Sequence, residues 1–243
     1  MRNIMIFRIR CQINPLKNLE FAKKERGFSV LDKFKQMVID AGKKMASEKL
    51  TIGTWGNISV RDSEEGYIFV TPSGMEYDSC TCADIVVFDK EGNWAEGERR
   101  PTTEKNLHIM IYRQRKDINA IIHTHPLYSM TFAVAGQPVP AVTEEFAQIV
   151  GYEVKCAGYA LPGTDELAQK TVDSLGQNNA VLLENHGAVC VGDNMAKAFR
   201  VAEVLEKTAH ILILCKSIGL PKIISSEEVK VLQAYVRESY GQK

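Results

Sequence analysis

Three of the five histidines stand where imidazoles could bind one metal ion. His123 and His125 form an HxH pair in AIIHTHP, at the end of an apolar run, and His186 follows another apolar run in LLENHGAV. Residues i and i+2 of a strand point to the same face, so the first two rings can reach one ion together. Three neutral imidazoles with one exchangeable position form a catalytic zinc site. The spacing predicts such a site, against the alternative that each histidine is an ordinary surface or core residue.

The sequence around His186 contains a turn signal, and the remaining two histidines lie in a different context. A glycine follows His186 and is expected to let the backbone turn sharply there. His108 and His210 fall within predicted helices and are interpreted as packing or surface residues. The three-histidine site is therefore predicted without them.

One carboxylate and several loops are further candidates. Glu104 begins a helix in RPTTEKNLH, either as an acid that stabilises the helix N-terminus or as a carboxylate that binds metal and moves a proton. The segments GTWGNISV, TPSG and PTTE offer turn N–H groups, hydroxyls and a helix N-terminus that could hold a phosphate, although ordinary hairpin turns look similar. The sequence contains no GxxxxGK[ST] or GxGxxG motif, so a nucleotide is not expected.

The elements that must position these residues follow from hydrophobic periodicity. Helical spacing predicts helices that begin near Phe28 and over 101–115, 126–135, 163–175, 194–218 and 225–238, with Thr102 or Thr103 as the N-cap of the second. Short β-rich runs predict strands at 56–62, 67–72, 84–89, 119–125 and 154–160, and a strand pair over 180–192 that bends at 185–187. Strands and helices without strict alternation predict an α/β layered domain with a mixed or largely antiparallel sheet.

Composition limits the possible partners. The chain has 243 residues, 45% hydrophobic and 25% charged, which suits one large domain or at most two small ones. Thirty basic residues balance thirty acidic ones, so neither nucleic acid nor a membrane is an expected partner, and no apolar run is long enough to span a bilayer. Residues 1–27 are predicted to be a poorly packed basic leader, and 28–243 a single domain. Six scattered cysteines predict free thiols and a cytoplasmic location.

Five motifs in order carry a family resemblance: GNISVRD, VTPSGMEYD, GERRPTTE, NAIIHTHP and ENHGA. Over about residues 30 to 240 the sequence resembles the class II aldolase/adducin-head family, and most closely its L-fuculose-1-phosphate aldolase-like enzymes. The resemblance implies a three-layer α/β/α sandwich around a mixed, largely antiparallel sheet. It also implies one divalent metal per subunit, usually Zn²⁺ with Co²⁺, Mn²⁺ or Fe²⁺ as alternatives, and a homotetramer with active sites at subunit interfaces.

The resemblance also implies roles for individual residues. The metal ligands would be His123, His125 and His186, and Glu104 would be the fourth ligand and the acid/base. The phosphate pocket would comprise Gly56, Asn57, Ser73, Gly74, Thr102 and Thr103. Tyr240, in ESYGQK, would reach a neighbouring subunit's site. Two positions depart from the fuculose enzyme, Glu144 in place of a tyrosine and Pro162 in place of a phenylalanine, and both concern the aldehyde half of the substrate.

The implied activity is that of a metal-dependent aldolase. It would cleave a ketose 1-phosphate, a phosphorylated sugar similar to L-fuculose 1-phosphate, to dihydroxyacetone phosphate and an aldehyde through an enediolate. The alternatives on the same site are a pentulose-5-phosphate 4-epimerase and a sugar-phosphate dehydratase or decarboxylase. An aldolase is favoured because known epimerases of the family tend to carry aspartate where this chain has Glu104. A non-catalytic adducin-like module would be expected to lack the metal ligands.

Overall fold

A computed structural model of the chain describes residues 29–238. The predicted leader, Cys11 and Tyr240 lie outside this range. Within residues 29–238, no helix is long and apolar enough to cross a membrane. The cysteines that the structure describes, Cys80, Cys82, Cys156, Cys190 and Cys215, are all free thiols.

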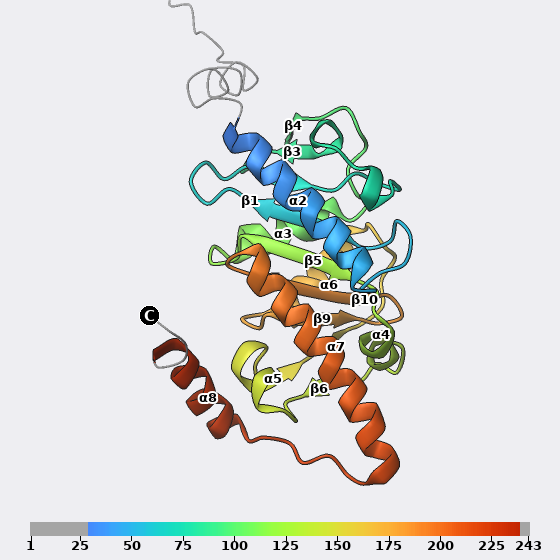
Figure 1. The fold of residues 1–243 in the computed structure, drawn as a ribbon, viewed down its shortest axis with the longest axis vertical. Helices are drawn as coiled ribbons and strands as arrows, with labels where there is room; N and C mark the ends of the chain where they lie inside the picture. Colours follow the sequence, from blue (N-terminus) through green and yellow to red (C-terminus); the bar gives the residue numbers. More distant parts are fainter. Residues whose placement is uncertain (1–28, 239–243) are drawn as a thin grey trace, which may run out of the picture.

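An eight-stranded sheet forms the centre of the molecule (Figure 1). Its strands, in spatial order, are β4 (Trp94–Glu96), β3 (Val86–Phe88), β2 (Ile68–Val70), β1 (Asn57–Arg61), β5 (Ala120–Thr124), β10 (Gly187–Gly192), β9 (Ala180–Leu183) and β8 (Cys156–Ala157). Every pair is antiparallel except β8 with β9, which is parallel. The sheet is therefore mixed and largely antiparallel, as predicted.

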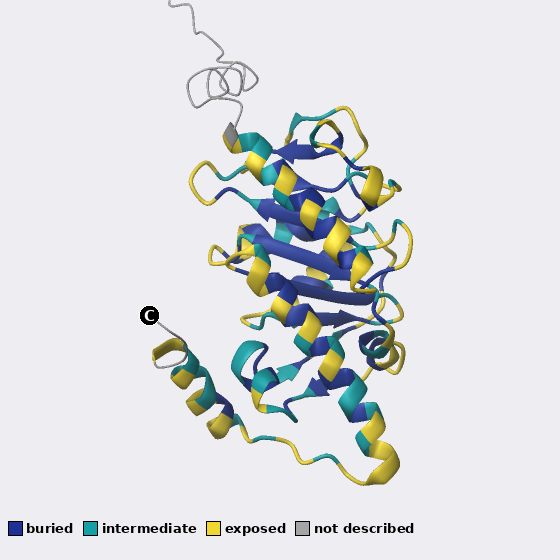
Figure 2. Cartoon of the chain, viewed as in Figure 1, coloured by how far each residue is buried: buried dark blue, intermediate teal, exposed yellow. Residues whose placement is uncertain are grey.

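Helices cover both faces of this sheet. In Figure 1, α2 (Ser29–Ser47) and α7 (Met195–Ile218) cross the near face, while α3 (Lys105–Gln114) and α6 (Asp165–Leu175) lie behind it. Alternate strand residues enter two separate cores: Ile122 packs with the α2 and α7 side chains, and Ile121 with those of α3 and α6. The central strands are accordingly buried on both faces, whereas the edge strand β4 is partly exposed (Figure 2). This arrangement confirms the three-layer α/β/α sandwich.

Smaller elements lie around the lower end of the sheet in Figure 1. They are α4 (Leu127–Val134), α5 (Glu144–Ile149), α8 (Ser226–Glu238) and a two-stranded sheet of β6 (Val139–Pro140) and β7 (Glu153–Val154). Two short 3₁₀ helices, Tyr77–Ser79 and Cys82–Asp84, follow β2. Helix α5 was not predicted, and the predicted strand over 154–160 is reduced to the end of β7 and β8. The hydrophobic pattern there is too short to separate a helix from a strand.

The start of α3 differs from the prediction in a way that concerns Glu104. The N-cap is Glu104 itself, not Thr102 or Thr103, and its side chain makes no capping hydrogen bond. Thr102 is held by tertiary pairing, because its N–H donates to the carbonyl of Thr71 (3.0 Å) and Pro101 bridges Pro72. The helix therefore begins only after this extended segment, and the Glu104 side chain is available for other contacts.

Candidate metal centre

The three predicted ligands meet where three neighbouring strands end. The C-terminal end of β5 lies between the N-terminal ends of β1 and β10, and His123 is in register with Asn57 on one side and Val189 on the other. His125 lies one residue beyond the end of β5, and His186 immediately precedes β10. Antiparallel pairing thus brings together residues that are more than sixty positions apart in the chain.

The facing nitrogen atoms have the spacing of ligands around one ion. The Nε2 atom of His123 lies 2.9 Å from Nε2 of His125 and 3.2 Å from Nε2 of His186. Bonds of 2.0–2.1 Å in a tetrahedral zinc site place neighbouring nitrogens about 3.3 Å apart. The Nδ1–H of His123 donates to the Ala188 carbonyl (3.0 Å), which leaves the lone pair of Nε2 facing the centre. The donor set and its spacing fit a divalent metal.

Glu104 completes the group from the start of α3. Its Oε2 lies 3.1 Å from Nε2 of His123 and accepts a hydrogen bond from Nδ2 of Asn57 (2.8 Å). Its Oε1 lies 3.4 Å from Nε2 of His186 and is buried without a hydrogen-bond partner among the described residues. A buried carboxylate oxygen without a donor costs free energy. Its position beside three imidazoles is suited to a fourth ligand or a base.

The electrostatics of the group favour a positive charge at its centre. Burial and the charge on His123 lower the pKa of His125 to about 3 and the pKa of His186 to about 4, so both rings are neutral at pH 7. Burial also lowers the pKa of His123, but the Glu104 carboxylate outweighs it and raises that pKa. Burial raises the pKa of Glu104. The interactions with His123, His186 and Asn57 lower it by more than burial raises it, so the pKa lies well below its usual range. A single proton cannot bind the lone pairs of three converging nitrogen atoms at once, but a divalent cation can.

Gly187 packs against the histidine rings. A Cβ atom there would lie 2.4 Å from the Thr124 carbonyl oxygen, 2.8 Å from the ring of His125 and 3.2 Å from the ring of His123. The sharp turn expected at this glycine belongs instead to Asn185, whose φ is 56°. Asparagine tolerates the left-handed region better than most residues. Gly187 is therefore required because a side chain there would have no room beside the histidine rings. The prediction that this glycine makes the sharp turn was wrong.

The predicted phosphate loops lie beside this centre. Asn57 begins β1 and Gly56 immediately precedes it, and a Cβ on Gly56 would lie 2.6 Å from the His123 carbonyl oxygen. The N–H of Ser73 donates to the Arg100 carbonyl (2.9 Å), which brings the Ser73-Gly74 turn next to the segment that holds Thr102 and Thr103. Ser73, Gly74 and Thr103 are exposed, whereas Thr102 is buried. The three loops thus meet at one end of the sheet.

The two departures from the fuculose enzyme fall in different places. Pro162 precedes Gly163, on which a Cβ would lie 3.0 Å from the Thr103 carbonyl oxygen, so this loop packs beside the phosphate segment. Glu144 begins α5 and lines a hollow against α8 with Ile224 and Val231. Glu144 therefore borders the same hollow as α8.

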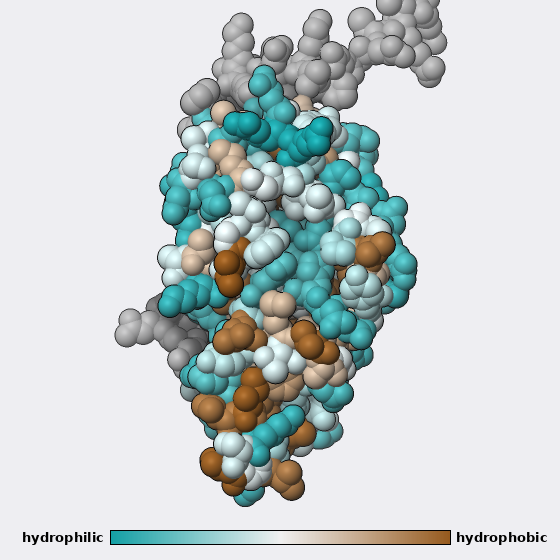
Figure 3. Space-filling model, turned by 90° about the vertical axis from the view of Figure 1, so that its right-hand side faces the viewer, coloured by the Kyte–Doolittle hydropathy of each residue, from teal (hydrophilic) through white to brown (hydrophobic). Residues whose placement is uncertain are grey.

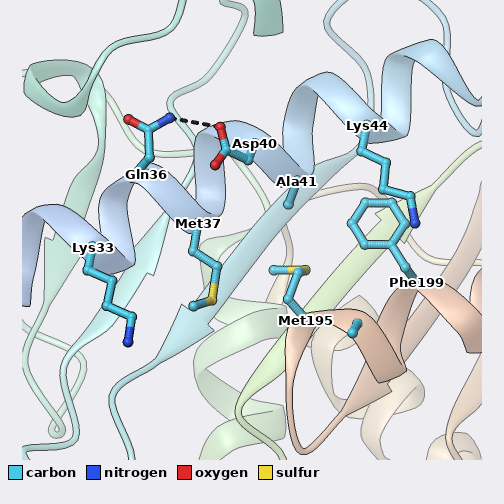
Figure 4. Close-up of a pocket in the computed structure, with 9 residues that line it drawn as sticks. Lys33, Gln36, Met37, Asp40, Ala41, Lys44, Met195 and Phe199 are labelled. Atoms are coloured by element: carbon cyan, nitrogen blue, oxygen red, sulfur yellow. Dashed lines mark hydrogen bonds between the residues drawn. The ribbon is translucent and has the colours of Figure 1, made fainter.

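Another hollow lies between α2 and α7, on the opposite face from α3. Figure 4 shows its lining side chains, among them Met37 and Met195. The Lys44 ammonium lies 4.4 Å from the centre of the Phe199 ring. None of the residues that line this hollow is a histidine or a predicted site residue. The converging ligands at the ends of β1, β5 and β10 are therefore the candidate site.

His108 was not predicted as part of the site. It is buried on α3, where its Nε2 bonds to Oδ1 of Asn57 and its Nδ1 lies 2.6 Å from Oγ of Ser59. Its spacing of four residues from Glu104 places both side chains on one face of the helix. That spacing was visible in the sequence, but the partner residues on β1 were not.

Sequence comparisons with known proteins find a family and several relatives for this chain. Residues 36–213 match the sequence profile of a family described as the Class II Aldolase and Adducin N-terminal domain. The 5-deoxy-D-ribulose 1-phosphate aldolase of Bacillus thuringiensis serovar kurstaki is 41% identical over 214 residues, which is 88% of this chain and 100% of that protein. The 5-methylthioribulose-1-phosphate/5-deoxyribulose-1-phosphate aldolase of Rhodospirillum rubrum is 33% identical over 84% of this chain and 90% of its own length.

A solved structure extends the likeness to three dimensions. The structure of an L-fuculose 1-phosphate aldolase superposes with a TM-score of 0.82 at 38% identity, over 84% of this chain and 96% of that one. The fold, the order of the motifs and the sequence likeness therefore point to the same group of proteins.

Proposed function

The chain belongs to the class II aldolase and adducin N-terminal domain family, as its motifs predicted, and from this premise we propose that it cleaves ketose 1-phosphates to dihydroxyacetone phosphate and an aldehyde. It is a class II aldolase, and so a lyase. The observation that carries the proposal is the convergence of three imidazole Nε2 atoms and the Glu104 carboxylate on one point. An adducin-like module would not need such a group of ligands.

The proposed mechanism assigns separate tasks to the residues of the site. A divalent ion held by His123, His125 and His186 would supply Lewis-acid stabilisation of the negative charge on the ketone oxygens. In condensation, Glu104 takes a proton from the hydroxymethyl carbon beside the ketone of dihydroxyacetone phosphate. In cleavage, the sugar hydroxyl at the breaking bond loses its proton, the carbon–carbon bond breaks, and Glu104 in its protonated form returns a proton to that carbon. Its lowered pKa keeps it ionised at neutral pH. Asn57 donates a hydrogen bond to Oε2 of Glu104 and leaves Oε1 of Glu104 without a partner among the described residues, facing the candidate metal centre.

The phosphate group is proposed to bind at the three loops that meet beside Glu104. The N–H groups of Ser73 and Thr102 already donate to backbone carbonyls, so the exposed hydroxyls of Ser73 and Thr103 and the turn at Gly74 are the groups available there. Gly56 and Asn57 are proposed to line the other side of this pocket. Fixing the phosphate orients the reacting carbon, and orientation contributes up to about 7–11 kcal/mol in favourable cases.

We propose Zn²⁺ as the native ion. Three imidazoles and one carboxylate suit zinc, and Co²⁺, Mn²⁺ or Fe²⁺ could occupy the same ligands. Metal analysis of the protein purified without added metal identifies the ion. The free thiols of the described cysteines suit a cytoplasmic enzyme.

The leading substrate candidate is 5-deoxyribulose 1-phosphate. A relative that matches 88% of this chain carries that name, and a solved relative carries the name of L-fuculose 1-phosphate aldolase. Cleavage between the third and fourth carbons of 5-deoxyribulose 1-phosphate gives dihydroxyacetone phosphate and acetaldehyde. The substitutions at Glu144 and Pro162 are in keeping with a different aldehyde half from that of the fuculose enzyme.

A panel of sugar phosphates tests this function. We expect the metal-loaded protein to release dihydroxyacetone phosphate from 5-deoxyribulose 1-phosphate, 5-methylthioribulose 1-phosphate or L-fuculose 1-phosphate, measured by coupled reduction to glycerol 3-phosphate. Chelation should abolish the release and Zn²⁺ should restore it, because the ligands hold the Lewis acid. Ribulose 5-phosphate is the control substrate. Its conversion to xylulose 5-phosphate, without release from any ketose 1-phosphate, would show an epimerase instead.

We also propose that the active enzyme is a homotetramer with its sites at subunit interfaces. Large apolar side chains are exposed near the candidate site: Ile52 is 74% exposed, Trp55 64% and Leu127 70%. Figure 3 shows further apolar side chains gathered toward the lower end of the face it views, and Leu214 and Ile218 at the end of α7 are exposed. Exposed apolar patches commonly mark contacts with another protein chain.

Sedimentation analysis tests the assembly. The wild-type protein should sediment with the mass of four chains, and the Ile52→Glu/Trp55→Glu double variant should sediment as a smaller species, because two buried charges at an interface are costly. We expect the double variant to have a lower kcat than the wild type as well as a lower mass, while its metal content stays near one ion per chain. A wild-type monomer with full activity would contradict the proposal.

A further inference from the structure

A ladder of buried polar side chains runs from Glu104 away from the candidate metal centre, between β1 and α3. The helix contributes Glu104, His108 and Tyr112, and the strand contributes Asn57 and Ser59. Asn57, Ser59, His108 and Tyr112 are each no more than 3% exposed. Buried polar groups are costly unless all are hydrogen-bonded, and in this ladder every one of those four side chains has a partner.

The ladder follows from the dimensions of the two elements. Four residues of an α-helix rise about 6 Å, and two residues of a strand rise about 6.7 Å. Side chains at i, i+4 and i+8 of α3 therefore interleave with side chains at i and i+2 of β1. The order along the ladder is Glu104, Asn57, His108, Ser59 and Tyr112.

The donors in this ladder can be assigned in sequence from the carboxylate. Ionised Glu104 only accepts, so Asn57 must turn its amide nitrogen toward Oε2 of Glu104 (2.8 Å). Oδ1 of Asn57 then faces Nε2 of His108, which must carry the proton. Burial lowers the pKa of His108 to about 3, so the ring is neutral and its Nδ1 is an acceptor.

The outer half of the ladder holds that tautomer in place. The hydroxyl of Ser59 donates to Nδ1 of His108 (2.6 Å). The oxygen of Ser59 is then left as the acceptor for the Tyr112 hydroxyl (2.9 Å). Burial raises the pKa of Tyr112, so it remains a protonated donor. Each hydrogen bond thus determines the direction of the next.

We propose that His108 is a positioning residue for Glu104, because its Nε2–H holds the Asn57 amide with the nitrogen turned toward the carboxylate. In the opposite orientation, the Asn57 oxygen would face the oxygen of Glu104. Two acceptors repel, so the carboxylate would move away or take up a proton, and in either case it would no longer serve as the base. The expected effect on turnover rests on the aldolase function proposed above.

Two substitutions at His108 separate positioning from packing. His108→Phe keeps a ring of similar size without the donor, and we expect kcat to fall about 10–100-fold with KM little changed, as for other partners that orient a ligand or base. His108→Gln restores a donor toward Asn57 and an acceptor toward Ser59, and we expect it to recover most of kcat. If both variants keep wild-type kcat, or if His108→Gln is no better than His108→Phe, the proposal is wrong.

A matched control accounts for lost stability. Thr171 is fully buried on α6, and its hydroxyl donates to the Leu167 carbonyl (2.7 Å). Thr171→Val removes a buried hydrogen bond on the same face of the sheet but outside the ladder. It should lower the free energy of unfolding and leave kcat unchanged.

The hydrogen-bond directions can be tested without a substrate. In ¹⁵N NMR of histidine-labelled wild-type protein, with His108→Gln used to identify the signals, His108 should appear as the Nε2–H tautomer. A crystal structure of His108→Phe should show the Asn57 side chain reoriented and Glu104 displaced. An Nδ1–H tautomer in the wild type would overturn the proposal whatever the substrate is. The expected tautomer together with no cleavage of any ketose phosphate would remove only the proposed function.

Discussion

Glu104→Gln is expected to leave the metal bound and to stop the exchange of protons between dihydroxyacetone phosphate and solvent. In the variant, the amide oxygen accepts from Asn57 Nδ2, as Oε2 of Glu104 does now. The amide nitrogen then occupies the place of Oε1 beside His186, where it can neither accept a proton nor bind a cation. General-base catalysis typically contributes 10²–10⁴-fold, so we expect exchange to slow by about that factor.

Deuterium incorporation into dihydroxyacetone phosphate, followed by NMR, measures this effect directly. Metal content measured on the same sample shows whether the three imidazoles still hold the ion. Glu203→Gln is the matched control, because Glu203 is exposed on α7 and pairs with Lys44 (2.8 Å). If Glu104→Gln exchanged protons at the wild-type rate, another group would have to be the base.

His186→Ala and His123→Ala are expected to lose the metal and the activity together. Each removes one of three converging Nε2 atoms. A Lewis acid contributes several kcal/mol to the stabilisation of an oxyanion, so kcat should fall by about a thousandfold or more. His186→Ala is the cleaner variant, because His186 Nδ1 has no partner within residues 29–238 and the side chain is 11% exposed. His123→Ala also leaves a cavity in the core.

Metal content per chain and kcat, measured on the same preparations, check the prediction. His210→Ala serves as the control, since His210 stacks on Tyr128 at 3.7 Å between ring centroids and lies outside the group of ligands. The control should keep both metal and activity. An active His186→Ala enzyme with one ion per chain would remove His186 from the ligand set.

Local patterns in the sequence were sufficient for most of the fold. The strand from Ala120 to Thr124 and the long helix from Met195 to Ile218 have strong periodicity and lie within a residue or two of their predicted bounds. The beginning of α3 was misplaced, because the pairing of Thr102 with Thr71 keeps that segment extended against its local capping preference. Tertiary pairing of this kind is invisible to propensity.

The sequence by itself determined which side chains could form a metal site, since an HxH pair, a third strand-end histidine and a carboxylate at a helix start are local features. Only the tertiary structure decided that they converge, because the register of β5 with β1 and β10 depends on pairing between distant segments. It also showed why Gly187 is needed, because the backbone of this glycine lies close to the rings of His123 and His125. It showed His108 to be linked to Glu104, because a link through Asn57 depends on how a helix lies against a strand.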